Sequence, residues 1–134
     1  MKNLILKRLK LQSSNNSTDY SKREKPKDPF IEKVLELLEL NYQDEDFGIS
    51  QFVEDIPFSR MQVHRKLKAL TGFSTSQFIN DFRLRKAKVH LEQNQLNVSE
   101  TAYACGFNDS GYFSKLFTKK YGTNPLAYKT ENIG

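Results

Sequence analysis

Apolar residues recur every three or four positions from residue 28 onward, which is the spacing of amphipathic helices. In the stretch "DPFIEKVLELLELNY" (28–42), Asp28 is placed to cap the first amides, and Pro29 suits the first helical position. The apolar positions of this stretch are Phe30, Ile31, Val34, Leu35 and Leu38. No strand-like alternation of apolar and polar residues stands out. The pattern predicts an all-α chain with seven helices.

Capping signals set the bounds of the other predicted helices. A Ser or Asn followed three residues later by Gln or Glu, the capping-box spacing, occurs at 59/62, 74/77 and 97/100. Gly72 and Gly122 are placed to end helices, and Pro125 to begin the last one. The predicted helices after the first cover about 49–56, 59–71, 75–93, 98–105, 109–121 and 125–130. The longest would span ~27 Å at ~1.5 Å per residue.

Two of these helix pairs form an internal repeat. Each unit is a short helix, a tight turn and a longer basic helix, which is the pattern of a helix-turn-helix. The matching pairs, at an offset of 49 and then 50 residues, are Ile49 and Val98, Phe58 and Phe107, Arg65 and Lys115, Leu67 and Phe117, Gly72 and Gly122, and Phe78 and Tyr128. We therefore predict a basic linker or tail over 1–27, a first helix-turn-helix subdomain over 28–73, a connecting helix over 74–92 and a second subdomain over 93–134.

The first longer helix has an apolar face and a polar face. At ~100° per residue, Val63, Leu67 and Leu70 share the inward face. The opposite face and its flanks carry Met61, Gln62, His64, Arg65, Lys68 and Ala69. Residues 59–72 contain no Asp or Glu, so this outer face is basic.

The second longer helix repeats that arrangement. Phe113 and Phe117 form its inward stripe, with Leu116 to one side. The outer face and its flanks carry Gly111, Tyr112, Ser114, Lys115, Thr118 and Lys119. Its one acidic residue, Asp109, belongs in the first turn, where the helix dipole favours a carboxylate.

The distribution of charge makes a polyanion the expected partner. The 134-residue chain has a net charge of +5, but residues 28–55 carry −8 and residues 56–134 carry +7. The major groove of DNA is ~12 Å wide and admits one helix, and basic side chains and helix-start amides can hold phosphates. We expect Ser59, Arg60, Lys68, Arg83, Ser110, Ser114, Thr118 and Lys119 to contact phosphates. For Arg83 and Arg85, ion pairing with acids of the first helix is the open alternative.

Other function classes find little support in the residues. No apolar run reaches the ~18 to 20 residues of a membrane span, and "MKNLILKRLKLQSS" is no signal peptide, so a cytoplasmic protein without membrane contact is expected. One cysteine cannot form an internal disulfide, and with only His64 and His90 beside it we expect no metal and no cofactor. Cys105 is expected to be a buried core residue, with a redox sensor as the alternative, and His90 a partly exposed helix residue.

Two stretches resemble the DNA-binding domain of the AraC/XylS family of bacterial transcription regulators. They are "SRMQVHRKLKALTGFSTSQFINDFRLRKA" and "VSETAYACGFNDSGYFSKLFTKKYGTNPLAY", and the likeness covers about residues 28–131. The resemblance implies two helix-turn-helix subdomains that bind adjacent major-groove segments of double-stranded DNA. By matched position it implies base-facing roles for Met61, His64, Arg65, Gly111, Tyr112 and Lys115, and the flanking Gln62 is added from its place on the outer face.

Two residues depart from the family pattern. Pro57 occupies the first turn, where the pattern favours a residue that tolerates positive φ, so that turn should differ locally. Gly111 offers no side chain to a base, so the second unit should rely more on phosphates and DNA shape.

The tail also bears a resemblance. A basic apolar stump, a polar linker and then this domain look like the join between a receiver and its output domain in hybrid two-component regulators. That resemblance implies fusion to receiver and sensor domains in a longer chain, dimerisation through them, and RNA polymerase as a further candidate partner.

Two alternatives to DNA binding remain at this point. One is a helical protein-interaction module that docks through its acidic first helix. The other is an enzyme, the weaker of the two, because the chain has no carboxylate pair, nucleophile–base set or phosphate loop. An active site would have to be assembled from His64, His90 and Cys105, which fall on separate helices.

Overall fold

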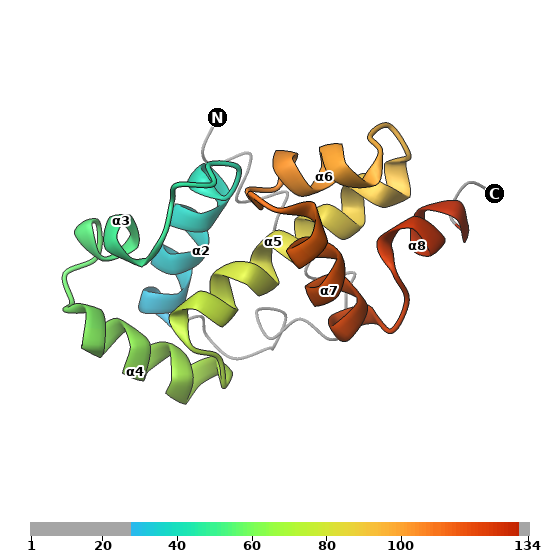
Figure 1. Ribbon diagram of the computed structural model, residues 1–134. Helices are drawn as coiled ribbons and strands as arrows, with labels where there is room; N and C mark the ends of the chain where they lie inside the picture. Colours follow the sequence, from blue (N-terminus) through green and yellow to red (C-terminus); the bar gives the residue numbers. More distant parts are fainter. Residues whose placement is uncertain (1–27, 132–134) are drawn as a thin grey trace.

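The computed structural model describes residues 28–131, and these form seven helices with no strand (Figure 1). The helices are α2 (Pro29–Asn41), α3 (Ile49–Glu54), α4 (Arg60–Thr71), α5 (Thr75–Gln93), α6 (Val98–Ala104), α7 (Ser110–Tyr121) and α8 (Pro125–Glu131). The predicted all-α fold of two helix-turn-helix units joined by a long helix is confirmed. The subdomain boundaries stay a prediction, and the tail expected over 1–27 lies outside the described residues.

Side-chain caps begin the helices where the sequence predicts them. The Ser59 hydroxyl accepts a hydrogen bond from Gln62 N at 3.2 Å, and Ser59 N donates to Gln62 Oε1 at 2.8 Å. The pairs Ser74 with Gln77 and Asn97 with Glu100 form the same reciprocal box. Each box satisfies amides that a helix start leaves without an intrahelical partner.

Glycines end the two longer helices of the repeat. Gly72 and Gly122 follow α4 and α7 with φ of 83° and 77°, the left-handed conformation that favours glycine. Their amides donate to Lys68 O and Thr118 O, so the last turn of each helix is closed.

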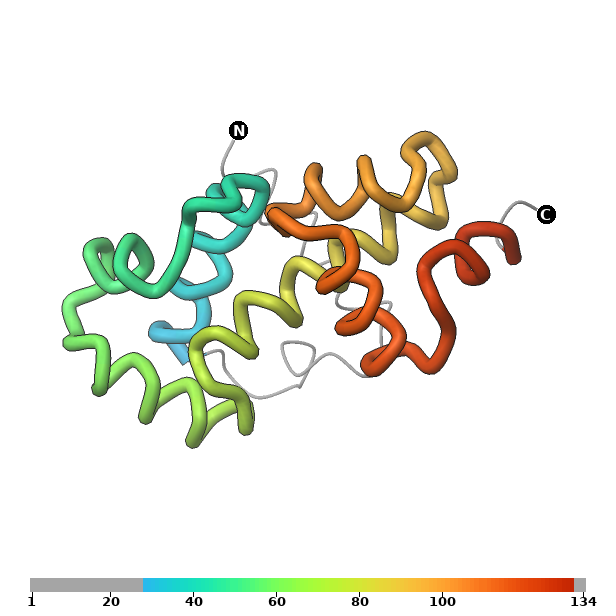
Figure 2. Tube along the Cα trace, viewed as in Figure 1, coloured from blue at the N-terminus to red at the C-terminus, as the bar shows by residue number. Residues whose placement is uncertain are grey.

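The long helix α5 lies at the centre of the fold. It contacts α4, α6, α7 and α8, and Figure 2 shows the chain wrapping around it. Its fully buried side chains are Phe78, Ala87 and Leu91, and Phe82 is almost as buried. One continuous apolar core therefore spans both units, and α5 contributes buried side chains to it between them.

The second unit is built around an aromatic cluster. Phe117 is fully buried, and its ring centroid lies 5.7 Å from that of Phe113, 4.7 Å from Tyr121 and 5.7 Å from Tyr128. The predicted inward stripe of α7 is confirmed. These tilted ring pairs fix the rotation of α7 about its own axis.

One predicted inward residue is wrong. Leu70 is 47% exposed, whereas Val63 and Leu67 of the same face are fully buried. Leu70 belongs to the last turn of α4, and the chain reverses at Gly72 so that Phe73 packs against the core instead. The apolar seam of α4 therefore ends at Leu67.

The turn at Pro57 differs from its counterpart, as predicted. Phe58 N donates to Ile56 O at 2.7 Å across Pro57, and no residue of this turn has a positive φ. In the second unit Gly106 has φ 92°, and Phe107 N donates to Ala102 O at 3.0 Å. Proline cannot reach the glycine conformation, so the first turn closes by a tighter bond.

Phe117→Ala should lower the free energy of unfolding by about 3–5 kcal/mol, because the change opens a cavity beneath α7. Urea titration followed by circular dichroism measures this loss. Leu126→Ala, at a residue that is 64% exposed, is the control and should change stability by less than about 0.5 kcal/mol. Equal losses in both variants would contradict the central place given to the aromatic cluster.

Candidate nucleic-acid interface

The helix α4 presents a polar outer face while its apolar side is held in the core. Val63 and Leu67 are fully buried, whereas His64, Arg65 and Lys68 are exposed. Met61, at the start of this face, is 61% exposed. Most of this large apolar side chain is therefore accessible on the outer side of α4.

Three predicted contacts at the start of α4 are already engaged with the protein. Ser59 and Gln62 hold each other in the capping box, and Arg60 Nη2 donates to Ser50 Oγ of α3 at 2.8 Å. Gln62 keeps its amide NH₂ as a donor, because the box uses only its oxygen. The start of α4 is thereby tied to α3, and its exposed first turn is ordered.

The helix α7 repeats this division between a buried and an exposed side. Phe113 and Phe117 point into the core, and Tyr112 is 49% exposed. The other exposed predicted residues of α7 are Gly111, Lys115, Thr118 and Lys119. Ser110 and Ser114 are half-buried. The structure thus places the predicted residues of each unit together on one helix face.

Local contacts fix part of the α7 face. The Asp109 carboxylate accepts a hydrogen bond from Tyr112 N at 2.9 Å and so caps the helix, in agreement with its predicted place at the helix start. Asn80 Nδ2 of α5 donates to the Tyr112 hydroxyl at 3.4 Å, and Thr118 Oγ1 donates to Ser114 O at 2.8 Å. The hydrogen bond from Asn80 therefore restricts the orientation of the Tyr112 side chain.

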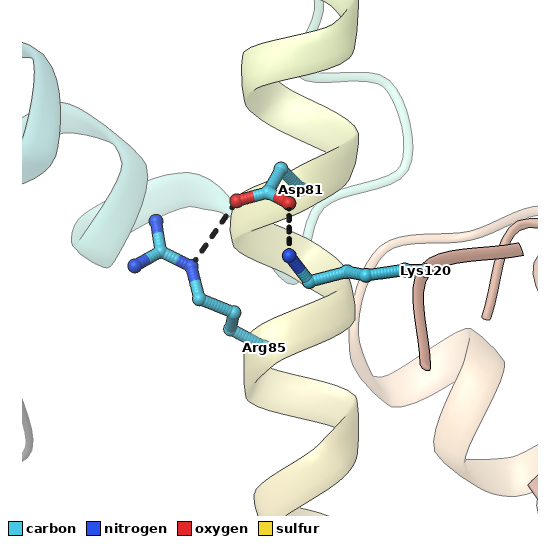
Figure 3. A network of polar contacts seen from close by, with 3 residues as sticks. All are labelled: Asp81, Arg85 and Lys120. Carbon is cyan, nitrogen blue, oxygen red and sulfur yellow. Dashed lines mark hydrogen bonds and ion pairs between the residues drawn. The ribbon is translucent and has the colours of Figure 1, made fainter. Parts of the chain in front are cut away.

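An ion-pair network seats the end of α7 on α5 (Figure 3). Asp81 accepts a hydrogen bond from Lys120 Nζ at 2.5 Å and forms an ion pair with Arg85, whose Nε lies 3.3 Å from the second carboxylate oxygen. Lys120, which follows the predicted phosphate contact Lys119, is therefore paired within the protein. Asp81 itself was missed, although its i,i+4 spacing to Arg85 on a predicted helix is a signal that could have pointed to it.

Arg83 does not lie on the interface, which corrects its predicted phosphate role. Only 7% of the residue is exposed. Its guanidinium donates to three backbone carbonyls of the α2–α3 loop: Tyr42 O at 3.0 Å, Asp44 O at 2.9 Å and Phe47 O at 3.1 Å. The open alternative, ion pairing with an acid of the first helix, is wrong too, because the acceptors are carbonyls. Burial lowers the pKa of this guanidinium from its ordinary value.

Cys105 and His90 have the positions predicted for them. Cys105 is fully buried, and burial raises the pKa of its thiol to about 12. His90 is half-buried near the end of α5, where burial and then the charge of Lys86 lower its pKa.

Within residues 28–131 no three His, Cys, Asp or Glu side chains gather as a metal site would need, and no helix there is long and apolar enough to cross a membrane.

Two capped helices with basic outer faces, each preceded by a short helix and a turn, match a family model. The model is described as a helix-turn-helix domain, and the match covers residues 53–131. The chain belongs to the AraC-type helix-turn-helix family. The resemblance found in the sequence is thus confirmed, and the domain is of the kind that binds DNA in transcription regulators.

Known proteins of this family carry the domain in different settings. The chain is 35% identical over 99 residues to a protein named histidine kinase P4 from Formosa agariphila, covering 74% of this chain and 7% of that protein. It is 35% identical over 92 residues to the transcriptional activator RhaS of Escherichia coli, covering 69% and 33%. The chain therefore spans a third or less of the length of these relatives.

A solved structure of the family also matches. The DNA-binding domain of AdpA, a global transcriptional factor solved in complex with a target DNA, superposes with a TM-score of 0.69 at 28% identity. The match covers 78% of this chain and 93% of that one.

The buried thiol of this AraC-type domain should resist alkylation. With its pKa raised to about 12 and no exposed surface, Cys105 is neither ionised nor accessible near neutral pH. Mass spectrometry after iodoacetamide treatment should show slow labelling in the native protein and rapid labelling in concentrated urea. Rapid labelling of the native protein would favour the redox-sensor alternative instead.

Proposed function

We propose that this chain is the DNA-binding output domain of a bacterial transcription regulator. In this proposal α4 and α7 enter adjacent major-groove segments of one duplex, and the domain itself has no enzymatic activity. The observation that carries the proposal is the division of both helices: Val63 and Leu67, like Phe113 and Phe117, are fully buried, while the opposite faces are exposed and free of acidic residues. A helix held by one side alone can be inserted into a groove without unpacking the core.

The proposed roles follow from reach and chemistry. Arg65 and Lys115 occupy matched positions near the middle of the exposed faces, where a long cation can reach guanine in the groove. Met61, Gln62, His64 and Tyr112 flank them as base-edge contacts, and Gly111 lets the α7 backbone approach closely. Ser59, Arg60, Lys68, Ser110, Ser114, Thr118 and Lys119 are assigned to phosphates, of which Arg60 keeps part of its guanidinium for its bond to Ser50.

The setting of the domain is also proposed. The relative named as a histidine kinase, of which this domain covers 7%, supports a longer chain that joins sensor and receiver domains to this output domain. Such a chain would dimerise through those other domains, contact RNA polymerase when bound to its operator, and keep this domain in the cytoplasm.

Docking of a protein partner through the first helix finds less support. The helix α2 buries Phe30, Ile31, Val34, Leu35, Leu37 and Leu38, so its apolar side is already covered. Of its acids, Glu39 is paired with Lys86 at 2.7 Å. What remains exposed combines charged residues such as Lys33 with a single large apolar side chain, Leu40, which is 43% exposed.

Selection from a pool of random duplexes at moderate salt tests the proposed function. We expect enrichment of a site with two short conserved segments whose centres lie about one turn, ~34 Å, apart along the duplex. Enrichment of no sequence over bulk DNA would contradict specific recognition. Enrichment of a single short segment would contradict the use of both helices.

Arg65→Ala and Lys115→Ala should each weaken binding to the selected duplex by about 1–3 kcal/mol and relax specificity at one base pair. Both residues are exposed, so thermal stability should change little. Fluorescence anisotropy with the selected duplex and with single-base variants measures both effects.

Lys33→Ala is the matched control, since it removes an exposed cation from α2, away from both faces. It should change binding little. A uniform loss for Arg65→Ala across all duplexes, with the salt dependence reduced by about one ion, would reassign that residue to a phosphate.

A further inference from the structure

Arg83 holds the α2–α3 loop against the middle of α5. Its three hydrogen bonds to Tyr42 O, Asp44 O and Phe47 O close the loop of residues 42–48 around one guanidinium. Tyr42 is also fixed through its ring, which packs edge-on against Phe82 with the centroids 5.8 Å apart. Carbonyls 42, 44 and 47 thus converge on a single rigid fork, which a lysine could not reproduce.

Gly106 approaches the same place from the second unit. It has φ +92°, and a Cβ built on it would lie 1.9 Å from Tyr42 O and 2.6 Å from Arg83 Nε. Such distances are not sterically possible, so only glycine permits this approach. Tyr42, Arg83 and Gly106 therefore form a contact between the first unit, the connecting helix and the second turn, which we call the inter-unit joint.

The joint lies close to the start of α7 in the chain. Gly106 precedes the α7 cap, Asp109, by three residues, and the flanking Cys105 and Phe107 are buried. A displacement of Gly106 must therefore be taken up by a short, packed segment that leads directly into α7. On the other side, the α2–α3 loop leads into α3, which contacts α4 and is tied to it by Arg60 and Ser50.

None of the three residues belongs to the outer faces of α4 and α7. Tyr42 and Arg83 are 8% and 7% exposed, and Gly106 is buried. Their effect on DNA must therefore act through the placement of the two reading helices. For two linked binding units, affinity depends on how well the linkage matches the spacing of the two sites.

We propose that the inter-unit joint sets the spacing and rotation of α7 relative to α4, so that Arg83 and Gly106 are positioning residues for spacing specificity. This inference rests on the proposed binding of two adjacent groove segments. One inserted base pair moves the second segment by about 3.4 Å and about 35° around the duplex. A domain with a rigid joint cannot follow that change without losing contacts.

The experiment compares the selected duplex with the same duplex lengthened by one base pair between its two segments. Wild-type protein should bind the lengthened duplex about 100-fold more weakly. Gly106→Ala forces the joint apart, so its affinity for the original spacing should fall about 10-fold and its insertion penalty should shrink below about 10-fold. Binding to duplexes with one segment scrambled should stay at the wild-type level.

Gly122→Ala is the matched control. Gly122 also has a positive φ, +77°, but a Cβ there would meet nothing within 4 Å. This variant carries the same backbone strain without the collision, and it should keep the full insertion penalty. An equal change in Gly122→Ala and Gly106→Ala would overturn the proposal, because strain alone would then explain the effect.

Arg83→Lys tests the other side of the joint and keeps the net charge. It should also shrink the insertion penalty, and it decides the question if Gly106→Ala loses its helical circular dichroism signal. An unchanged penalty in Arg83→Lys would overturn the inference. Absence of any penalty in the wild-type protein would instead contradict the proposed binding of two adjacent segments, so the two failures are distinguishable.

Discussion

The arrangement of this domain depends on one buried arginine. A guanidinium in the apolar interior is costly unless it is hydrogen-bonded, and Arg83 donates three hydrogen bonds to carbonyls of the α2–α3 loop. The loop carbonyls gain hydrogen-bond donors, and α5 gains a fixed contact with the first unit. Because Gly106 closes over the same atoms, the second unit is placed by that bond as well.

The two units pack their longer helices, α4 and α7, against the core with different kinds of side chain. The first unit seats its reading helix with the aliphatic residues Val63 and Leu67, and the second with Phe113 and Phe117. Polar contacts then hold the helix ends: Arg60 to Ser50 at the start of α4, and Lys120 to Asp81 at the end of α7. These exposed or half-exposed pairs contribute little stability but restrict rotation of the helices.

Local features of this fold could be predicted from the sequence, and long-range ones could not. The capping box at Ser59 and the left-handed Gly72 depend on residues within one turn, so their spacing is enough. The outer faces follow from the helical period in the same way. Arg83 was assigned to phosphates because a sequence shows its charge but not the loop carbonyls 36 to 41 positions earlier in the chain. Leu70 was misplaced for a related reason: the helical period puts it on the face of Leu67, but it does not show that Phe73, after the reversal at Gly72, packs against the core instead.

The residues that pack each helix into the core are different from those proposed to contact DNA. This has a consequence for how such a domain can diversify. Arg65 and Lys115 are exposed, so they can vary with little effect on folding. If they contact bases as proposed, single substitutions there would change the target sequence. In the proposal above, the distance between the two half-targets is less free to vary, because it depends on the close approach of Gly106 to Tyr42 and Arg83, where any side chain would collide. Related domains with this fold would therefore change the base sequence that they recognise more readily than the spacing between the two recognised segments.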